Sequence, residues 1–320
     1  ASAGGAGMSG ATSPGAASSP HGSAASPHAS FAERVASGSR GPSPTVEWQV
    51  AGACNYDCSY CIQSRIYRRG RPSDAQLRGT LATLAALAGV WEVKCSGGEA
   101  FAHPPFLSLV VPGLMDATPH RISVLTNFSA SRGDLMRFTA RTRGRLAVFS
   151  ASLHTEHVDP IEFADKARWF VDGLDPEVAF VVNQVVLPDR LDAARAVRDS
   201  LAERGIRWFP QLLKVGGRVT DYPDEAALRS LIGDAPGPRE ANLAPSYFGR
   251  ACWAGSKYFA IDKDGGAWAC RTSKRHGEGA LGDAFAGAVT LRDGPLPCPY
   301  DVCPCTVPAN RGMIAGIGPG

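Results

Sequence analysis

Three cysteines in one short segment constrain this chain more than any other feature of its sequence. They follow the apolar stretch VEWQVA with the spacing Cys54-x3-Cys58-x2-Cys61. Thiolates this close in one loop usually share a metal, and a cubane iron-sulfur cluster normally takes four cysteines. Because no fourth cysteine lies nearby in the sequence, one iron of such a cluster would be left open. The alternatives are chance clustering or a structural zinc knuckle, although zinc sites prefer paired C-x2-C knuckles and a fourth ligand.

From Pro44 onwards, the chain alternates between apolar strand patterns and helical patterns of period 3.6. We expect strands over Val46–Ala51, Trp91–Cys95, Arg121–Thr126, Leu146–Ser152, Val178–Leu187 and Ile206–Leu213. We expect helices near Asp74–Ala88, Pro105–Met115, Gly133–Arg141, Pro160–Val171 and Leu191–Arg204. Parallel strands joined by helices form either an open doubly wound sheet or a barrel. The sequence therefore predicts an α/β fold, with functional loops at the carboxyl ends of its strands.

Small and polar residues follow the second, third and fourth predicted strands. Gly97, Gly98 and Glu99 come directly after the second strand. Glycines let a backbone approach a ligand closely, and a carboxylate can pair with a cationic amine. Thr126-Asn127 ends the third strand, and Ser152 lies at the end of the fourth. Each of these segments can also be an ordinary turn or a polar strand end.

The cysteine spacing, the aromatic Tyr60 before the last cysteine and the Gly-Gly-Glu segment one βα unit later resemble the radical S-adenosylmethionine (SAM) superfamily. The resemblance implies a partial (β/α)6 barrel and a 4Fe-4S cluster on the three cysteines, with the open iron chelated by the amino and carboxylate groups of SAM. In the family, the Gly-Gly-Glu segment holds the amino group, and the two later polar segments contact the methionine carboxylate and the ribose. The implied SAM-binding residues are Tyr60, Gly97, Gly98, Glu99, Thr126, Asn127 and Ser152.

Three further features of the barrel region allow two interpretations each. Asn183 and Gln184 interrupt the fifth strand, and either point toward a ligand or are satisfied by neighbouring backbone. The polar run His154–Asp159 after the fourth strand either lines a substrate pocket or is a solvated loop. Cys95 could be catalytic, but a free cysteine often behaves as a small buried hydrophobe.

Five more cysteines lie near the C-terminus. Cys252 and Cys270 enclose the predicted strand Lys257–Ile261, a hairpin turn over Asp262–Gly266, and Trp268. This arrangement resembles the opening of the twitch and SPASM modules of radical SAM enzymes, which bind auxiliary 4Fe-4S clusters. The remaining cysteines, in a pattern that departs from the longer SPASM type, are Cys298, Cys303 and Cys305.

Counting ligands limits what these five cysteines can bind. Two auxiliary clusters would need about eight cysteines, so we expect one auxiliary 4Fe-4S cluster, as in the shorter twitch type. Cys252, Cys270, Cys303 and Cys305 are its expected ligands. Cys298 then remains as a thiol that can return a hydrogen atom to a substrate radical. The assignment within the last three cysteines stays open, and a zinc-binding module is the alternative.

Composition indicates how the chain is organised. We expect a disordered low-complexity tail over 1–44, a radical SAM barrel over 45–216, a linker over 217–250 and an auxiliary cluster domain over 251–320. The first 32 residues contain no Asp, Glu, Lys or Arg, and they cannot bury enough apolar surface to become ordered.

Charge, hydropathy and cysteine content limit which binding partners and which cellular compartment we expect for this chain. The formal net charge of +3 without a clustered basic stripe argues against a nucleic-acid partner. No apolar run reaches the roughly 18 to 20 residues of a membrane span, so we expect no membrane partner. Nine cysteines in a chain of this size fit metal binding in a reducing cytoplasm better than disulfides.

The resemblance also implies a function. Relatives that modify ribosomal peptides often carry an additional leader-binding domain, and here the first strand begins soon after the tail, so we expect a small-molecule secondary metabolite as substrate. Among short auxiliary-cluster enzymes, the chain is most similar to those that act on aminoglycosides. We expect an epimerase of a sugar carbon, served by an external one-electron reductant such as flavodoxin or ferredoxin. The alternatives are a twitch-type dehydrogenase, a peptide-modifying enzyme, or a metal-binding or electron-carrier protein without catalysis.

Overall fold

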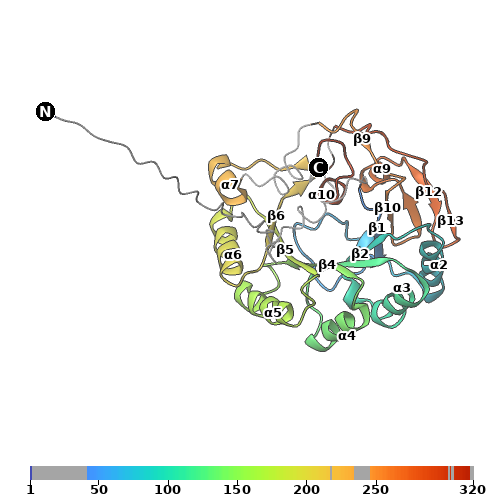
Figure 1. Ribbon diagram of the computed structural model, residues 1–320, viewed down its shortest axis with the longest axis horizontal. Helices are drawn as coiled ribbons and strands as arrows, with labels where there is room; N and C mark the ends of the chain where they lie inside the picture. Colours follow the sequence, from blue (N-terminus) through green and yellow to red (C-terminus); the bar gives the residue numbers. More distant parts are fainter. Residues whose placement is uncertain (2–41, 217, 234–245, 302, 304–305, 318–320) are drawn as a thin grey trace. The chain divides into compact units, whose positions relative to one another are not determined.

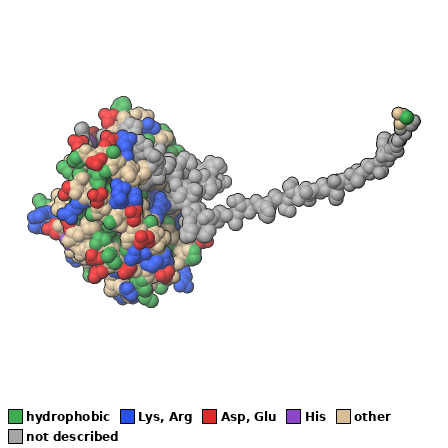
Figure 2. Space-filling view, turned by 90° about the vertical axis from the view of Figure 1, so that its left-hand side faces the viewer, with side chains coloured by type: hydrophobic (Ala, Val, Ile, Leu, Met, Phe, Trp, Pro, Cys, Tyr) green, Lys and Arg blue, Asp and Glu red, His purple; other side chains and the backbone are tan. Residues whose placement is uncertain are grey.

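The computed structural model describes residues 1, 42–216, 218–233, 246–301, 303 and 306–317. Almost all of the predicted tail and Cys305 therefore lie outside the described residues. Among the described residues, no helix combines the length and the apolar character that crossing a bilayer requires. On the face in Figure 2, basic and acidic side chains of the described residues are interspersed, in keeping with the small net charge.

The chain begins as a series of parallel strands with helices between them. The strands are β1 (Thr45–Ala51), β2 (Glu92–Gly97), β3 (Arg121–Thr126), β4 (Leu146–Leu153), β5 (Ala179–Val186) and β6 (Trp208–Leu212). Each of them pairs in parallel with the next one along the chain. The helices α2 (Asp74–Ala85), α3 (Val111–Ala117), α4 (Arg132–Thr142), α5 (Pro160–Asp172) and α6 (Leu191–Glu203) lie outside the curved sheet (Figure 1). The six predicted strands and five predicted helices are confirmed, with shifts of a few residues at their ends.

Short elements modify this pattern. A 3-10 turn, η1 (Tyr67–Arg69), follows the cysteine loop, and η2 (Ala100–Ala102) follows Glu99. The helix predicted from Pro105 begins as a π-helical turn, η3 (Phe106–Val110), which continues into α3. Pro112, at the start of α3, has no N–H to donate, which interrupts the regular helical hydrogen bonds at this junction.

The C-terminal strands extend the same sheet. The strands β10 (Tyr258–Ile261), β11 (Gly266–Trp268), β12 (Ala280–Asp283) and β13 (Ala288–Val289) lie beyond β1, in the order β13-β12-β11-β10-β1. β10 pairs in parallel with β1, Thr45 opposite Tyr258 and Trp48 opposite Ile261. The predicted hairpin is present, because β10 and β11 pair antiparallel. The boundaries predicted for the domains stay predictions, and the sheet continues across them.

The remaining elements are short. They are β7 (Lys214–Val215), β8 (Arg218–Val219), α7 (Glu225–Ile232), β9 (Ala251–Cys252), α9 (Arg271–Arg275), β14 (Leu296–Pro297) and α10 (Thr306–Asn310). α7 lies within 217–250, the segment expected to be a linker, and packs Leu228 and Leu231 against Val186 and Leu212.

Alternation along the strands separates an apolar face from a polar one. Val46, Trp48 and Val50 of β1 belong to the main hydrophobic core, and their neighbours Glu47 and Gln49 are buried on the opposite face of the strand. Buried polar residues need partners, and many of these come from the C-terminal part of the chain. The Tyr258 hydroxyl donates to Glu47 Oε2 over 2.7 Å. Polar contacts on this face therefore join the C-terminal strands to the first strand of the barrel.

Candidate functional site

The three N-terminal cysteines lie in an irregular loop between β1 and η1. Cys54 is half-buried, Cys58 is buried and Cys61 is exposed. Burial, together with a smaller effect of negative charge on Cys61 and Cys54, raises the pKa of Cys58 to about 11. All three thiols belong to one short loop, as ligands of a shared cluster can.

The glycines after β2 allow close contact with this loop. The Gly98 N–H donates to Ala51 O, and the Glu99 N–H donates to Ala53 O, each over 2.9 Å. A Cβ atom on Gly98 would lie only 2.2 Å from Ala53 O. Gly97 has a φ of +147°, which other residues rarely adopt. Both glycines are therefore required for β2 to end directly beside the start of the cysteine loop.

Glu99 is the centre of a buried polar cluster. Its Oε1 accepts hydrogen bonds from the Phe101 N–H (3.1 Å) and the Thr126 hydroxyl (2.7 Å). Its Oε2 accepts from the Asn127 N–H over 2.5 Å. Burial raises the pKa of Glu99, although these hydrogen bonds lower it in part. The structure thus brings together Glu99, Thr126 and Asn127, three of the predicted SAM-binding residues.

Asn127 connects this cluster to the cysteine loop. Its Nδ2 donates to Asn55 Oδ1 over 2.9 Å and lies 4.0 Å from Cys54 Sγ. Asn55 Nδ2 in turn donates to Ser129 Oγ over 2.9 Å. Phe128 lies between Asn127 and Ser129 in the chain. Its φ is +61°, a backbone conformation that is strained for a residue with a side chain. The sequence did not predict a role for Asn55, although this residue directly follows Cys54.

The ends of β4 and β5 contain the other predicted polar residues. Ser152 pairs with Asn183 in the register of these two strands. The Nδ2 of Asn183 is buried without a hydrogen-bond partner in the described structure, so this amide is available to a ligand. Gln184 is different, because its Oε1 accepts from the Trp208 Nε1–H over 2.9 Å. A neighbouring side chain therefore satisfies the Gln184 amide oxygen, whereas the Asn183 amide can contact a ligand.

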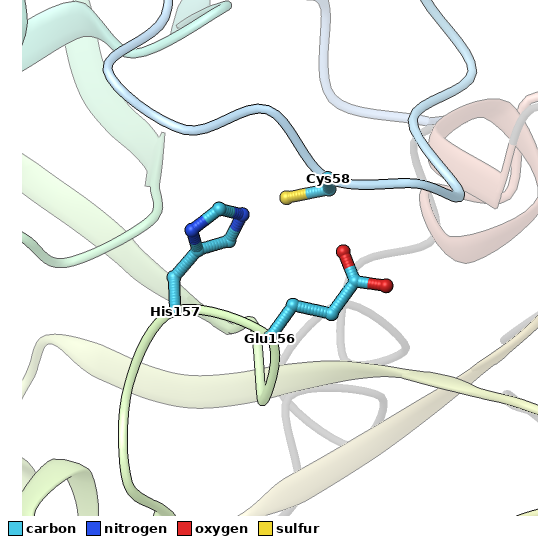
Figure 3. Close-up of side chains that lie close together, drawn as sticks. All are labelled: Cys58, Glu156 and His157. Carbon is cyan, nitrogen blue, oxygen red and sulfur yellow. The ribbon is translucent and has the colours of Figure 1, made fainter.

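The polar run after β4 contacts the cysteine loop. The Ser59 N–H and the Ser59 hydroxyl both donate to the Glu156 carboxylate, the N–H over 2.8 Å. The Glu156 and His157 side chains extend from their loop towards Cys58 on the facing loop (Figure 3). The Cys58 Sγ, a Glu156 carboxylate oxygen and a His157 ring nitrogen all lie within 4.8 Å of one another. The Ser59 hydrogen bonds lower the pKa of Glu156, which keeps this carboxylate ionised at neutral pH. These contacts could not be predicted from sequence.

Tyr60 also contacts this run. Its hydroxyl lies 3.1 Å from His154 Nδ1, and the two rings are stacked with centroids 5.9 Å apart. Burial, together with a smaller effect of His157, lowers the pKa of His154 to about 4. His154 is therefore a neutral imidazole at pH 7, a hydrogen-bonding partner for Tyr60 that carries no charge.

Four C-terminal cysteines share one apolar cluster. Cys252, Cys270, Cys298 and Cys303 are all buried, together with residues such as Met313. Burial, together with a smaller effect of negative charge on the nearby Cys298 and Cys270, raises the pKa of Cys252 to about 12. Cys303 Sγ lies 3.7 Å from the Thr272 hydroxyl, two residues from Cys270. Cys298 thus lies beside two of the expected cluster ligands, a place that suits a ligand as well as a free thiol.

Cys95 is separate from both groups. It belongs to β2 and is fully buried in the main hydrophobic core. Burial raises its pKa to about 12.

Helix α9 connects the two cysteine groups. It begins at Cys270, whose Sγ accepts from the Ser273 N–H over 3.2 Å. The next residue, Arg271, pairs with Glu47 over 2.8 Å and donates to Ser96 Oγ over 3.1 Å. Ser96 immediately precedes Gly97, so the helix that starts at a C-terminal cysteine reaches the end of β2. Sequence reasoning missed Arg271 because its partners are far away along the chain.

No protein-family model matches the sequence. No curated protein matches it either. Among solved structures, Streptococcus suis SuiB bound to S-adenosylmethionine is similar, with a TM-score of 0.57 and 16% identity over 76% of this chain and 63% of SuiB. The protein anSMEcpe with bound AdoMet is similar, with a TM-score of 0.54 and 14% identity over 76% of this chain and 78% of that protein. At these identities the similarity shows a common fold. The chain has the α/β partial-barrel fold of radical SAM enzymes, as its cysteine spacing predicts.

Proposed function

We propose that this chain is a radical SAM enzyme in which Cys54, Cys58 and Cys61 hold a 4Fe-4S cluster with one iron open for SAM. The observation that carries the proposal is the position of Glu99, whose buried carboxylate lies beside the loop that contains the three cysteines. The donor set suits the cluster, because iron-sulfur centres take soft thiolate ligands. A bound metal cation would favour the thiolate form and so reverse the raised pKa of Cys54 and Cys58.

When bound and reduced, the cluster supplies the electron that cleaves SAM and yields a 5'-deoxyadenosyl radical, which takes a hydrogen atom from a substrate carbon. The chain binds and orients SAM. We assign the methionine amino group to Glu99 and the two glycines before it. Thr126 and Asn127 are assigned to the methionine carboxylate, and Ser152 to the ribose. Tyr60 precedes the last cysteine, and its hydroxyl is oriented by His154.

The most specific part of the proposal is epimerisation of a sugar carbon in an aminoglycoside. The hydrogen atom lost by that carbon stays in 5'-deoxyadenosine. A cysteine thiol, with Cys298 as the first candidate, gives a hydrogen atom to the opposite face of the substrate radical and becomes a thiyl radical. One electron and one proton restore the thiol. The electron comes from an external one-electron reductant such as flavodoxin or ferredoxin, which places the reaction in the cytoplasm.

We further propose one auxiliary 4Fe-4S cluster in the C-terminal apolar cluster. Cys252 and Cys270 are two of its ligands, and two of Cys298, Cys303 and Cys305 complete the set. The burial of four cysteines in one place supports this assignment. By the four-cysteine rule, the reconstituted chain should then contain about eight irons. Twelve irons, or stoichiometric zinc after anaerobic purification, would contradict it.

A peptide-modifying enzyme is the second candidate. SuiB bound to the precursor peptide SuiA has the same fold, with a TM-score of 0.55 and 14% identity over 76% of this chain and 62% of SuiB. A dehydrogenase is the third, since a substrate radical that loses an electron instead of regaining hydrogen gives an oxidised product.

One incubation distinguishes these candidates. The anaerobically reconstituted chain is mixed with SAM, reductant and a panel of aminoglycosides and peptides in deuterated water. Epimerisation predicts one deuterium at the inverted carbon, because a thiol hydrogen exchanges with solvent, and one SAM consumed for each product. A product two hydrogens lighter than its substrate means dehydrogenation, and a mass change confined to peptides means the second candidate.

The Cys298→Ala variant then identifies the hydrogen donor. If Cys298 is the donor, this variant keeps about eight irons and still cleaves SAM, but it forms no epimer. Loss of iron would instead make Cys298 a ligand and pass the donor role to Cys303, Cys305 or Cys95.

A further inference from the structure

The turn after β4 contacts the cysteine loop through three residues of that loop. Tyr56 stacks on His157, with ring centroids 4.4 Å apart and planes 10° from parallel, and meets His154 edge to face at 6.0 Å. Ser59 donates twice to Glu156, and Tyr60 meets His154. Residues on both sides of Cys58 are therefore in contact with residues 154–157. We call this segment the 154–157 turn.

The 154–157 turn is held firmly at both of its ends. Leu153, at the end of β4, is buried in the main core. The His157 N–H donates to His154 O over 2.9 Å, which closes the turn on itself. Asp159 then caps α5 by accepting from the Ile161 N–H over 2.8 Å and the Glu162 N–H over 3.1 Å. The turn can therefore act as a fixed support for whatever contacts it.

The cysteine loop has much less support of its own. Its residues lie outside helices and strands, and one backbone hydrogen bond described within it joins the Cys61 N–H to Cys58 O over 3.2 Å. Ser59, between these two cysteines, depends on Glu156 for the partner of its N–H. An irregular loop with few internal hydrogen bonds opens readily unless other contacts hold it.

We propose that the 154–157 turn is a clamp that keeps the cysteine loop in its cluster-binding shape, with Glu156 as the main positioning residue. The proposal rests on the function assigned to this loop above. Glu156 acts through Ser59, because its carboxylate accepts both the backbone N–H and the hydroxyl of the residue between Cys58 and Cys61. The tyrosine–histidine contacts hold the loop on either side of this pair. Glu156 is thereby a positioning residue, because it acts on the cysteine loop through Ser59.

The clamp is tested first on the full-length chain without metal. Millisecond hydrogen–deuterium exchange, resolved by peptide, measures how often the segment 54–61 opens. Glu156→Ala should speed its exchange about tenfold, because a charged acceptor of two hydrogen bonds is lost. Glu177→Ala, which removes an exposed glutamate in the loop before β5, is the matched control and should leave that segment unchanged. Equal exchange in the parent and in Glu156→Ala would overturn the proposal.

A double-mutant cycle shows whether Glu156 acts through Ser59. Ser59→Ala removes the hydroxyl donor, so Glu156→Ala should have a clearly smaller effect in that background than in the parent. Glu156→Gln keeps an acceptor oxygen and should restore about half of the protection on a logarithmic scale. Additive effects of the two alanine substitutions would contradict action through Ser59.

The second measurement uses the reconstituted chain. Glu156→Ala should lose iron to a chelator several times faster than the parent, and Glu156→Gln should lie between them. If the parent binds no cluster at all, the proposed function is wrong. The hydrogen–deuterium exchange experiment then still tests whether the 154–157 turn holds the cysteine loop. If the parent binds a cluster and Glu156→Ala loses it at the parent's rate, the clamp fails while the proposed function stands.

Discussion

The two cysteine groups of this chain are held in opposite ways. The N-terminal group lies in an irregular loop, where Cys61 is exposed and polar side chains from β3 and β4 provide the contacts. The described C-terminal cysteines are all buried in an apolar cluster, with Cys252 on β9 and Cys270 at the cap of α9. Structural metal sites are typically closed by protein, whereas catalytic sites keep a position open. The contrast supports the proposal that the first group leaves a position open for SAM and the second forms a closed site.

The largest expected effect is a difference in melting temperature between variants of the two cysteine groups. Alanine at Cys252 and Cys270 should remove about four irons and lower the melting temperature by roughly 10 °C, because a buried metal site and the cap of α9 are lost together. Alanine at Cys54, Cys58 and Cys61 should also remove about four irons but shift the melting temperature by at most about 2 °C. Iron analysis and calorimetry of both variants check this. Similar temperature losses in the two variants would abolish the contrast.

A smaller effect is expected within the N-terminal site. Glu99→Gln replaces an acceptor of three protein hydrogen bonds by a group that must turn its NH2 towards one of these donors. We expect SAM binding to weaken about 30-fold, since the substitution removes the negative charge that we assign to the methionine ammonium, and a hydrogen bond to a charged group contributes roughly 1.5 to 3 kcal/mol. Isothermal titration of the reconstituted chain with SAM measures this. Thr126→Val, which removes one donor only, should weaken binding less than Glu99→Gln does.

In the C-terminal part, Asp262 gives a pH-dependent effect. Its Oδ2 pairs with Lys274 over 2.6 Å and accepts from the Trp268 Nε1–H over 2.9 Å. Although burial raises the pKa of Asp262, these partners hold it below its ordinary value of 3.8. A lowered pKa in the folded state stabilises the chain above the unfolded value, and this contribution is lost as the pH falls through the folded value.

Asp262→Asn should therefore cost about 1 to 2 kcal/mol of unfolding free energy at pH 7. The difference between variant and parent should shrink as the pH falls below about 3.8, the ordinary value for an aspartate. Urea unfolding at a series of pH values measures it. A difference that stays constant down to about pH 2.5, well below that ordinary value, would mean that the charge of Asp262 contributes nothing.

The smallest expected effect concerns Asn55. This exposed side chain joins the cysteine loop to Asn127 and Ser129. Asn55→Ala should weaken SAM binding about threefold, the equivalent of one exposed hydrogen bond at roughly 0.5 to 1 kcal/mol. The melting temperature should not change measurably. A change in stability without a change in SAM binding would make Asn55 a structural residue only.

Local patterns in the sequence were enough to predict most of the barrel. The strand predicted over Arg121–Thr126 has those limits in the structure, because turn residues and period-2 alternation define it locally. The helix predicted to Ala88 ends at Ala85, shortly before Gly89, which has a φ of +78°. Spacing within a few residues likewise identified the cysteine loop and the Gly-Gly-Glu segment.

Features that depend on long-range pairing could not be predicted. β10 pairs with β1 although the two strands lie near opposite ends of the described chain, and nothing within either strand specifies that partner. Arg271 and Glu47, or Glu156 and Ser59, are polar residues in ordinary local settings, and only the fold brings them together. The assignment of the C-terminal cysteines needs the same information, since their buried cluster forms from separate segments of the chain.

The central claim is that the N-terminal loop holds the cluster that cleaves SAM, whereas the C-terminal group does not. The most direct measurement is the amount of 5'-deoxyadenosine formed from SAM by anaerobically reconstituted, chemically reduced protein. The parent should form it, and the variant with alanine at Cys54, Cys58 and Cys61 should form none while retaining about four irons. Unchanged 5'-deoxyadenosine formation by that variant, or none by the parent with a full complement of iron, would contradict the claim.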